Sequence, residues 1–143
     1  TQWAITTDFS TEVAPARDAV ERLEHDIGGV MQGLREGREL DTQALASGIG
    51  TLVDSITRNP SALPWVLELK RKGDYVYRHA LGCSVWAATF GRHLGLEREG
   101  LRDIALGALL CDVGKVRLAQ PLLDRPAPLR EAEFHALRSH VAE

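Results

Sequence analysis

Apolar residues near the N-terminus recur at alternating steps of three and four, which is the spacing of a heptad repeat. This pattern places them along one side of a long helix. Two interpretations are open: the helix packs against its own domain, or it is a signalling or dimerising helix that pairs with a second copy. The residues of this heptad seam are Val13, Ala16, Val20, Leu23, Ile27, Val30 and Leu34.

Helical spacing continues beyond the seam and is interrupted by residues that begin or end helices. Asp41 is suited to cap a second helix, and the pair Asn59-Pro60 is suited to end it. A third, short helix is predicted over residues 61–72, and the following Gly73 is expected to break it. The apolar face of the second helix consists of Leu45, Ile49, Leu52, Val53 and Ile56.

A fourth helix is predicted over residues 74–94, and its side chains fall into two neighbouring stripes. We assign the larger side chains of the second stripe, together with its cysteine, to plain core packing. The first stripe holds Val76, Ala80, Ala87 and Leu94, and the second holds His79, Cys83, Trp86 and Phe90.

A fifth helix is predicted over residues 98–112, and it is nearly all apolar from Ile104 onward, so we expect it in the middle of the fold. After a loop that contains three prolines, a sixth helix is predicted over residues 129–143. No segment shows the period-two alternation between turn residues that a half-buried strand needs. The sequence therefore predicts an all-α, multi-helix bundle of about six helices.

Composition limits the classes of partner. The chain has 143 residues, enough for one domain, and is 44% hydrophobic and 26% charged, as an ordinary globular protein is. Its net charge of -3 gives no general attraction to DNA or to anionic lipid, so any phosphate chemistry must be local. No apolar run of about 18 residues marks a membrane span.

The two cysteines, Cys83 and Cys111, lack the spacing of a zinc knuckle or a disulfide framework. Free cysteines fit a reducing compartment, so we expect a cytoplasmic protein. The chain begins with Thr1, and we expect it to be a piece of something longer.

Three of the five histidines are assigned to structural or solvated roles. His25 and Asp26 resemble a metal dyad, but the heptad seam places both on the solvent side. His93 closes a helix, where a cation meets the helix dipole favourably, and His135 is read as a surface residue.

His79, Asp112 and His140 form the candidate metal set. His79 lies on an apolar stripe, Asp112 ends an apolar helix, and His140 lies at the edge of the last helix's apolar arc. Imidazole and carboxylate suit Fe, Mn or Zn. Lys115 follows Asp112 by three residues, and it either holds an anionic substrate oxygen or caps the helix carbonyls.

The motifs around these residues resemble the HD-GYP branch of the HD-domain phosphohydrolases. They are Tyr75-Val-Tyr-Arg-His79, the segment LGALLCDVGK from Leu106 to Lys115, Pro121-Leu-Leu, Leu129, Glu133 and His140. The resemblance covers residues 59–143, so we divide the chain into an N-terminal helical region, 1–58, and a partial HD-GYP-like domain, 59–143. It implies an HD-type helical bundle that hydrolyses the bacterial second messenger cyclic-di-GMP with the help of metal ions.

By this resemblance His79 would bind a first metal, Asp112 would bridge two metals and His140 would bind the second. Lys115 would contact the scissile phosphate, which makes Asp112 and Lys115 the catalytic residues. The implied cofactor is a divalent transition metal, Fe, Mn or Zn, in a two-metal site. The family reaction uses a water or hydroxide held between the metals to attack phosphorus in line.

The chain departs from the family pattern at three places. Cys111 stands where the family has the His of its His-Asp pair, and it would bind metal as a softer, oxidisable ligand. Tyr75 stands where some members carry an acidic ligand for a third metal. The sequence ends at Glu143, before the family's later histidine pair, its Gly-Tyr-Pro loop and its last aspartate ligand. We therefore expect an impaired catalytic site.

Three functional hypotheses follow from the resemblance and its departures. The leading one is a cyclic-di-GMP phosphodiesterase domain with impaired catalysis. The alternative is a catalytically inactive HD-GYP-like module that binds the nucleotide or partner proteins and forms a homodimer through its N-terminal helix. The third is an HD hydrolase for another phosphate ester.

Overall fold

A computed structural model describes residues 3–70, 75–123 and 128–141, and within them all regular structure is helical. This confirms the all-α class, and the seven α-helices of the described residues agree with the expectation of about six. The elements are α1 (Phe9–Arg35), α2 (Gln43–Arg58), α3 (Ala62–Leu69), α4 (Tyr75–His93), α5 (Arg98–Leu110), the 3-10 helix η1 (Val113–Arg117), α6 (Gln120–Leu123), α7 (Glu131–Arg138) and the 3-10 helix η2 (Ser139–Val141).

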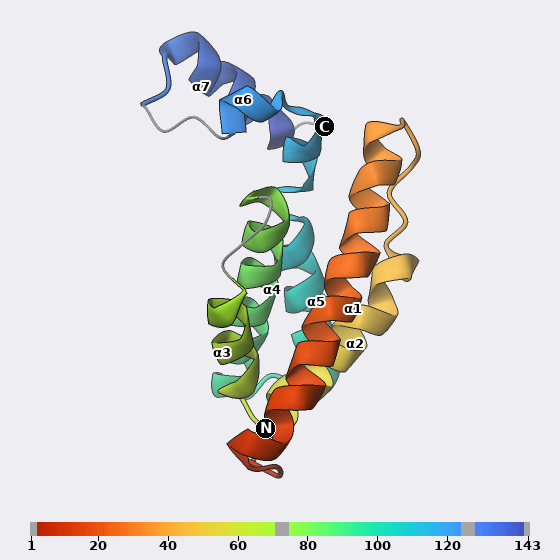
Figure 1. The fold of residues 1–143 in the computed structure, drawn as a ribbon, viewed down its shortest axis with the longest axis vertical. Coiled ribbons are helices and arrows are strands. Elements are labelled where there is room, and N and C mark those ends of the chain that lie inside the picture. The colour runs from red at the N-terminus through yellow and green to blue at the C-terminus, as the bar shows by residue number, and fades with distance from the viewer. Residues whose placement is uncertain (1–2, 71–74, 124–127, 142–143) are drawn as a thin grey trace.

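Helices α1 to α5 form the bundle, and α6 and α7 lie across one end of it (Figure 1). The chain leaves α5 at this end and passes through η1 before it reaches α6. Of the three prolines predicted to lie in a loop, Pro121 lies within α6 and Pro128 precedes α7, whereas Pro126 lies outside the described residues. The sixth helix predicted over 129–143 begins later, as α7, and is followed by the 3-10 helix η2, whereas residues 142–143 lie outside the described residues.

Helix α1 packs against its own domain. Asp8 begins it by accepting a hydrogen bond from the Thr11 backbone N–H at 3.0 Å. The middle of the heptad seam is fully buried, with Val20, Leu23 and Ile27 at 0% exposure, against α2, α3 and α4. Dimerisation stays a prediction, and a dimer would need a surface other than this seam.

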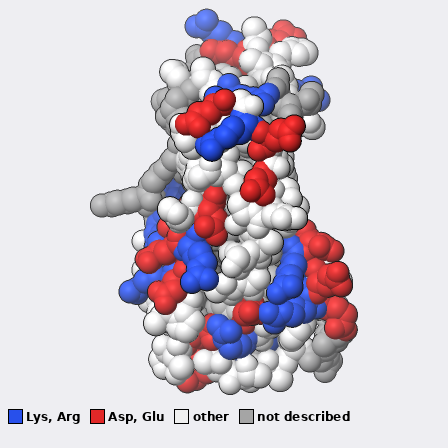
Figure 2. Space-filling view, turned by 90° about the vertical axis from the view of Figure 1, so that its right-hand side faces the viewer, with Lys and Arg blue, Asp and Glu red and all other residues white. Residues whose placement is uncertain are grey.

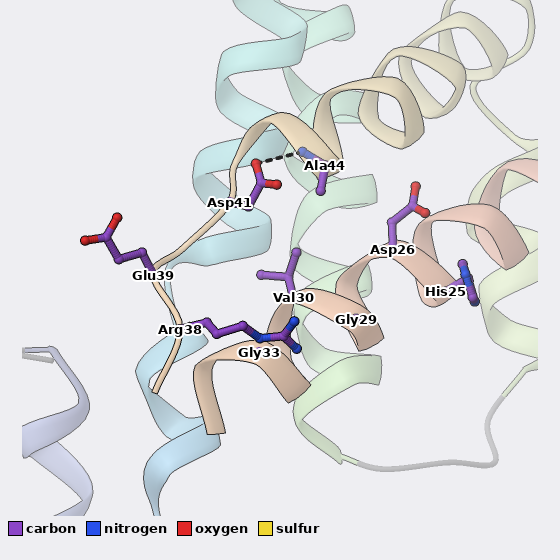
Figure 3. A pocket seen from close by; sticks show the side chains of 9 residues that line it. All are labelled: His25, Asp26, Gly29, Val30, Gly33, Arg38, Glu39, Asp41 and Ala44. Atoms are coloured by element: carbon purple, nitrogen blue, oxygen red, sulfur yellow. Dashed lines mark hydrogen bonds between the residues drawn. The ribbon is translucent and has the colours of Figure 1, made fainter. Parts of the chain in front are cut away.

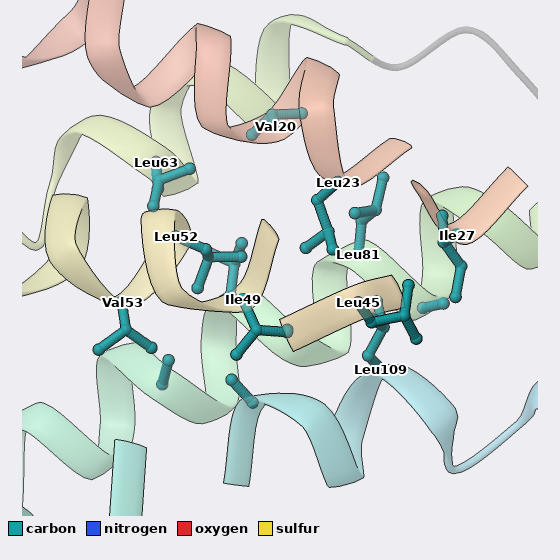
Figure 4. Close-up of a cluster of buried hydrophobic side chains, with 14 of the residues drawn as sticks. Val20, Leu23, Ile27, Leu45, Ile49, Leu52, Val53, Leu63, Leu81 and Leu109 are labelled. Atoms are coloured by element: carbon teal, nitrogen blue, oxygen red, sulfur yellow. The ribbon is translucent and has the colours of Figure 1, made fainter. Parts of the chain in front are cut away.

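Helix α2 begins as the sequence predicts, because Asp41 Oδ1 accepts from the backbone N–H groups of Gln43 and Ala44 at 3.0 and 3.2 Å. Its apolar face closes one continuous core with the four other helices of the bundle (Figure 4). This core crosses the boundary predicted between residues 58 and 59, so that boundary does not separate two cores. The labelled core residues are Val20, Leu23, Ile27, Leu45, Ile49, Leu52, Val53, Leu63, Leu81 and Leu109.

Two predictions about burial are wrong. Trp86 and Phe90 do not lie in the core; they are 61% and 59% exposed. Helix α4 turns a different face inward, because its small residues allow α5 to approach closely. Helix α5 is not central either, since only Leu101, Ala105 and Leu109 are buried on it. The buried residues of α4 are Val76, Ala80, Leu81, Ser84, Val85, Ala88 and Gly91.

Charged side chains of both signs are interspersed on the face drawn in Figure 2, and the described residues form no continuous basic patch there. This agrees with the weak net charge. Among the described residues, no helix combines the length and the apolar character that crossing a lipid bilayer requires.

An ion pair between buried Glu12 and partly exposed Arg58 fixes the start of α1 to the end of α2. The Glu12 side chain is 1% exposed and accepts two hydrogen bonds from Arg58, from Nε at 2.8 Å and Nη2 at 2.7 Å. Burial alone would raise the pKa of Glu12, but the hydrogen bonds and charge of Arg58 outweigh it and lower that pKa.

We predict that Glu12→Gln lowers the free energy of unfolding at pH 7 by about 1.5–3 kcal/mol, the range for a hydrogen bond to a charged group. Because the folded pKa of Glu12 lies below the ordinary 4.5, the stabilisation is complete above that pH and is lost as the pH falls through the folded pKa. Urea unfolding from pH 7 to pH 3 measures both effects. Asp18→Asn, on the exposed side of α1, is the control; an acid-independent gap between wild type and Glu12→Gln contradicts the assignment.

Candidate metal centre

The Asp112 carboxylate lies between three nitrogen-bearing side chains. Its Oδ2 is 3.1 Å from Nε2 of His79 and 2.6 Å from Nζ of Lys115, and its Oδ1 is 3.1 Å from Nε2 of His140. The structure therefore brings together four residues from three separate parts of the chain: His79, the neighbours Asp112 and Lys115, and His140. We call this group the Asp112 centre.

Each of the four residues is placed by a different piece of local structure. His79 lies in the first half of α4, and the packing of α4 on α5 brings it to the end of α5. Asp112 follows α5 directly, in the turn before η1, and Lys115 lies within η1. His140 comes from η2, which contacts η1.

Gly114 permits the approach of His140. A Cβ atom on Gly114 would collide with the backbone carbonyl oxygen of His140 and would lie 3.0 Å from its carbonyl carbon. Only a residue without a side chain allows η2 to come so close to η1. The sequence shows this glycine directly after the Asp112 turn, but nothing in the sequence indicates which backbone packs on it.

The hydrogen bonds of His140 determine which of its ring nitrogens carries a proton. Nδ1 faces the Leu137 carbonyl oxygen, which can only accept, so Nδ1 must donate. In a neutral ring, Nε2 then points its lone pair at Asp112 Oδ1. Two facing acceptors need a cation between them, which is either a proton on Nε2 or a metal ion bound by both groups.

Asp112 remains ionised in this setting. Burial alone would raise its pKa, but the hydrogen bond and charge of Lys115, with contributions from His140 and His79, hold that pKa below its usual range. The Lys115 ammonium is bonded to this carboxylate, which favours a role in the centre over capping of helix carbonyls. A metal ion that bound Oδ2 would compete with Lys115 for that oxygen.

The two thiols differ in exposure and in the groups that they contact. Cys111 is exposed, and its Sγ donates to the Ala108 carbonyl oxygen at 3.2 Å. Partial desolvation of its thiol by neighbouring atoms raises the pKa of Cys111, although the residue is exposed overall, and the nearby Asp112 carboxylate and Cys83 thiol add to this effect. The thiol beside an imidazole is that of Cys83, 3.6 Å from Nε2 of His79. Cys83 follows His79 by four residues, about one helical turn, and this spacing is the sequence feature that could have indicated the contact.

The donor set suits divalent transition metals. Two ligands that bind one cation at about 2.1 Å lie roughly 3.0–3.4 Å apart, and each imidazole here lies 3.1 Å from a carboxylate oxygen. Because the imidazoles approach different oxygens, the arrangement suits a carboxylate shared between two cations. Within the ranges that the structure describes, no group of three or more His, Cys, Asp and Glu side chains is disposed to hold a metal by itself. A closed site needs further ligands.

The remaining histidines lie outside the Asp112 centre. His25, His93 and His135 are exposed, as predicted. His25 and Asp26 border a separate hollow of about 390 Å³ between α1 and the loop before α2, in which Arg38 lies across Gly33 (Figure 3). Asp26 is only half-buried there.

Two curated proteins are similar to the chain. The cyclic di-GMP phosphodiesterase PA4108 of Pseudomonas aeruginosa is 28% identical over 138 residues, a match that covers 89% of this chain and 33% of that protein. The 3'3'-cGAMP-specific phosphodiesterase 3 of Vibrio cholerae is 31% identical over 71 residues, which cover 50% of this chain and 15% of that protein. The chain thus spans about a third of the length of the first relative and less of the second.

Both relatives are phosphodiesterases by name, and the first similarity extends over most of the chain. These names agree with the phosphodiesterase activity that the resemblance to the HD-GYP branch implies. No family model and no solved structure matches the chain.

We predict that Gly114→Ala weakens metal binding by about 10–100-fold, the usual cost of disturbing the groups that orient a ligand. The added methyl group displaces the His140 backbone and so moves Nε2 away from Asp112. Isothermal titration with Mn²⁺ and Zn²⁺ measures the change. Gly107→Ala on α5, whose Cβ would meet nothing within 4 Å, is the matched control; equal affinities for the two variants would show that His140 is not a ligand.

Proposed function

We propose that the chain is an HD-GYP-type phosphodiesterase domain whose centre hydrolyses cyclic-di-GMP with the help of divalent metal ions. The observation that carries the proposal is the Asp112 carboxylate with one imidazole at each of its oxygens. The names of the two relatives add the substrate class, a cyclic dinucleotide. A cytoplasmic location stays a prediction.

The residues of the centre have separate tasks. Asp112 would hold both cations, and His79 and His140 would each hold one of them. When bound, such metal ions supply an activated water and neutralise the charge that develops on the phosphate. Lys115 has the charge and the short reach to hold a non-bridging phosphate oxygen once it turns from Asp112. This assigns catalytic roles to Asp112 and Lys115.

Catalysis by this centre is proposed to be impaired. Cys111 takes the place of an imidazole, and its Sγ is engaged with the Ala108 carbonyl oxygen rather than with the Asp112 carboxylate. As a ligand it would have to rotate inward, and its thiolate would bind as a softer donor than imidazole. The proposed site for two Fe, Mn or Zn ions would therefore have a weak ligand at residue 111.

A second candidate function is a catalytically inactive module that binds nucleotide or a partner protein. It is favoured by one observation: the Lys115 ammonium already neutralises Asp112 at 2.6 Å. A charge-balanced carboxylate holds a metal less tightly, because the ion must displace the lysine. Such a module would still bind a phosphate group beside Lys115.

We predict slow, metal-dependent hydrolysis of cyclic-di-GMP by the wild-type chain and a loss of about 100-fold or more in Asp112→Asn, which keeps the shape but removes the shared charge. Cys111→His is expected to raise both metal content and rate. Product formation is measured by chromatography with added Mn²⁺, Fe²⁺ or Zn²⁺, and metal content by elemental analysis of the same samples.

The matched control for the charge change is Asp103→Asn, which alters an exposed residue of α5. Metal-dependent binding without hydrolysis in the wild type and in Cys111→His supports the inactive module instead. Hydrolysis that persists unchanged in Asp112→Asn contradicts the assignment of the centre.

A further inference from the structure

A second pocket, of about 280 Å³, opens beside the Asp112 centre between α3 and α4. Pro64 and Leu67 of α3 form one wall, and α4 forms the other. His79 lines this pocket and also contacts Asp112. A ligand in the pocket would therefore lie next to the proposed metal ions.

Gly82 leaves the α4 side of the pocket flat, and we call this surface the floor of the pocket. Tyr75, His79, Gly82 and Trp86 recur at helical spacing on one face of α4, and Gly82 is the member without a side chain. A Cβ built on Gly82 meets nothing within 4 Å. The glycine is thus not required by packing, and its effect is to leave open space between two aromatic side chains.

Aromatic rings border the floor on both sides. Tyr75 stacks on the His79 ring, with centroids 5.4 Å apart and planes inclined by 15°. Trp86 is 61% exposed, one turn beyond Gly82. An exposed indole beside a slot with apolar side chains on its opposite wall is a surface on which a planar heterocycle stacks. A ligand bound there would cover the face of α4 that is exposed to solvent in the folded protein.

Charged side chains of both signs border the slot: Arg78 and Glu68 line the pocket, and Lys115 is bonded to Asp112 at the adjoining centre. The two cations, Arg78 and Lys115, suit a nucleotide rather than an apolar peptide. Cations of this kind bind phosphate oxygens. Gly82 follows His79 by three residues, a rise of about 4.5 Å along the helix, so a base over Gly82 would leave its phosphate near His79.

We propose that this α3–α4 pocket binds one purine base of a cyclic dinucleotide and stacks it against Trp86, with the adjoining phosphate directed to the Asp112 centre. The position of the phosphate rests on the proposed function; the base site rests on the pocket itself. The pocket thus selects substrates that carry a planar base next to the scissile phosphate.

Gly82→Leu tests the proposal, because a leucine fills the floor without meeting a neighbour at its Cβ. Equilibrium dialysis with guanosine 5'-monophosphate and with cyclic-di-GMP is expected to show affinities at least 10-fold lower than those of the wild type. Gly107→Leu, on an exposed site of α5 with the same open surroundings, is expected to bind as the wild type does. Thermal melting confirms that both variants fold.

A second pair of variants tests the stacking surface. Trp86→Ala is expected to weaken binding of the monophosphate at least 10-fold, whereas Trp65→Ala is expected to leave it unchanged. Trp65 is also partly exposed, at 42%, but its ring contacts Phe9 edge-on and lies outside the pocket. This pair also decides the question if Gly82→Leu does not fold.

Nucleotide binding that is equal in Gly82→Leu and Gly107→Leu, or in Trp86→Ala and Trp65→Ala, overturns the base site, as does the absence of binding by the wild type at millimolar nucleotide. Light scattering could instead show that Trp86→Ala converts a dimer to a monomer while its nucleotide affinity is unchanged. The exposed face of α4 around Trp86 would then be a contact between two copies of the chain. If the variants show that the base site is wrong but the wild type still hydrolyses cyclic-di-GMP with added metal, the proposed function stands. The two proposals can therefore fail separately.

Discussion

The Asp112 carboxylate controls the arrangement of the whole site, because an ionised acid can only accept hydrogen bonds. Every group that approaches it must bring a proton or share a cation with it. Lys115 brings protons, and the two imidazoles face the oxygens through nitrogens that suit a metal ion equally well. The fold thus concentrates positive charge, or the capacity to bind it, at the end of α5.

The same contacts hold the C-terminal segment in place. None of the described residues of α7 and η2 is buried, so apolar packing contributes little to their position. The segment is attached where His140 lies on Gly114 and faces Asp112. A cation shared by Asp112 and His140 would therefore also stabilise the junction between η1 and η2, since binding energy available only to the docked segment favours that state.

The sequence was sufficient for much of this picture. Heptad spacing placed α1, and Asp41 placed the start of α2, because caps and apolar periods act within a few residues of one helix. The set of His79, Asp112 and His140 followed from residue chemistry and from the resemblance, and the structure brings its members together. What the sequence left out depends on contacts between helices: the direction in which Trp86 points, the rotation of Cys111 and the backbone that packs on Gly114. The inward face of α4 is chosen by its fit to α5, and no period within α4 alone encodes that choice.

The most direct test of the central claim is anomalous diffraction from crystals grown or soaked with Mn²⁺ or Zn²⁺. The account predicts metal density within bonding distance, about 2.0–2.2 Å, of an Asp112 oxygen and of Nε2 of His79 or His140, with the Lys115 ammonium displaced from Oδ2. Metal density elsewhere on the chain, with the Asp112 contacts unchanged, would contradict it.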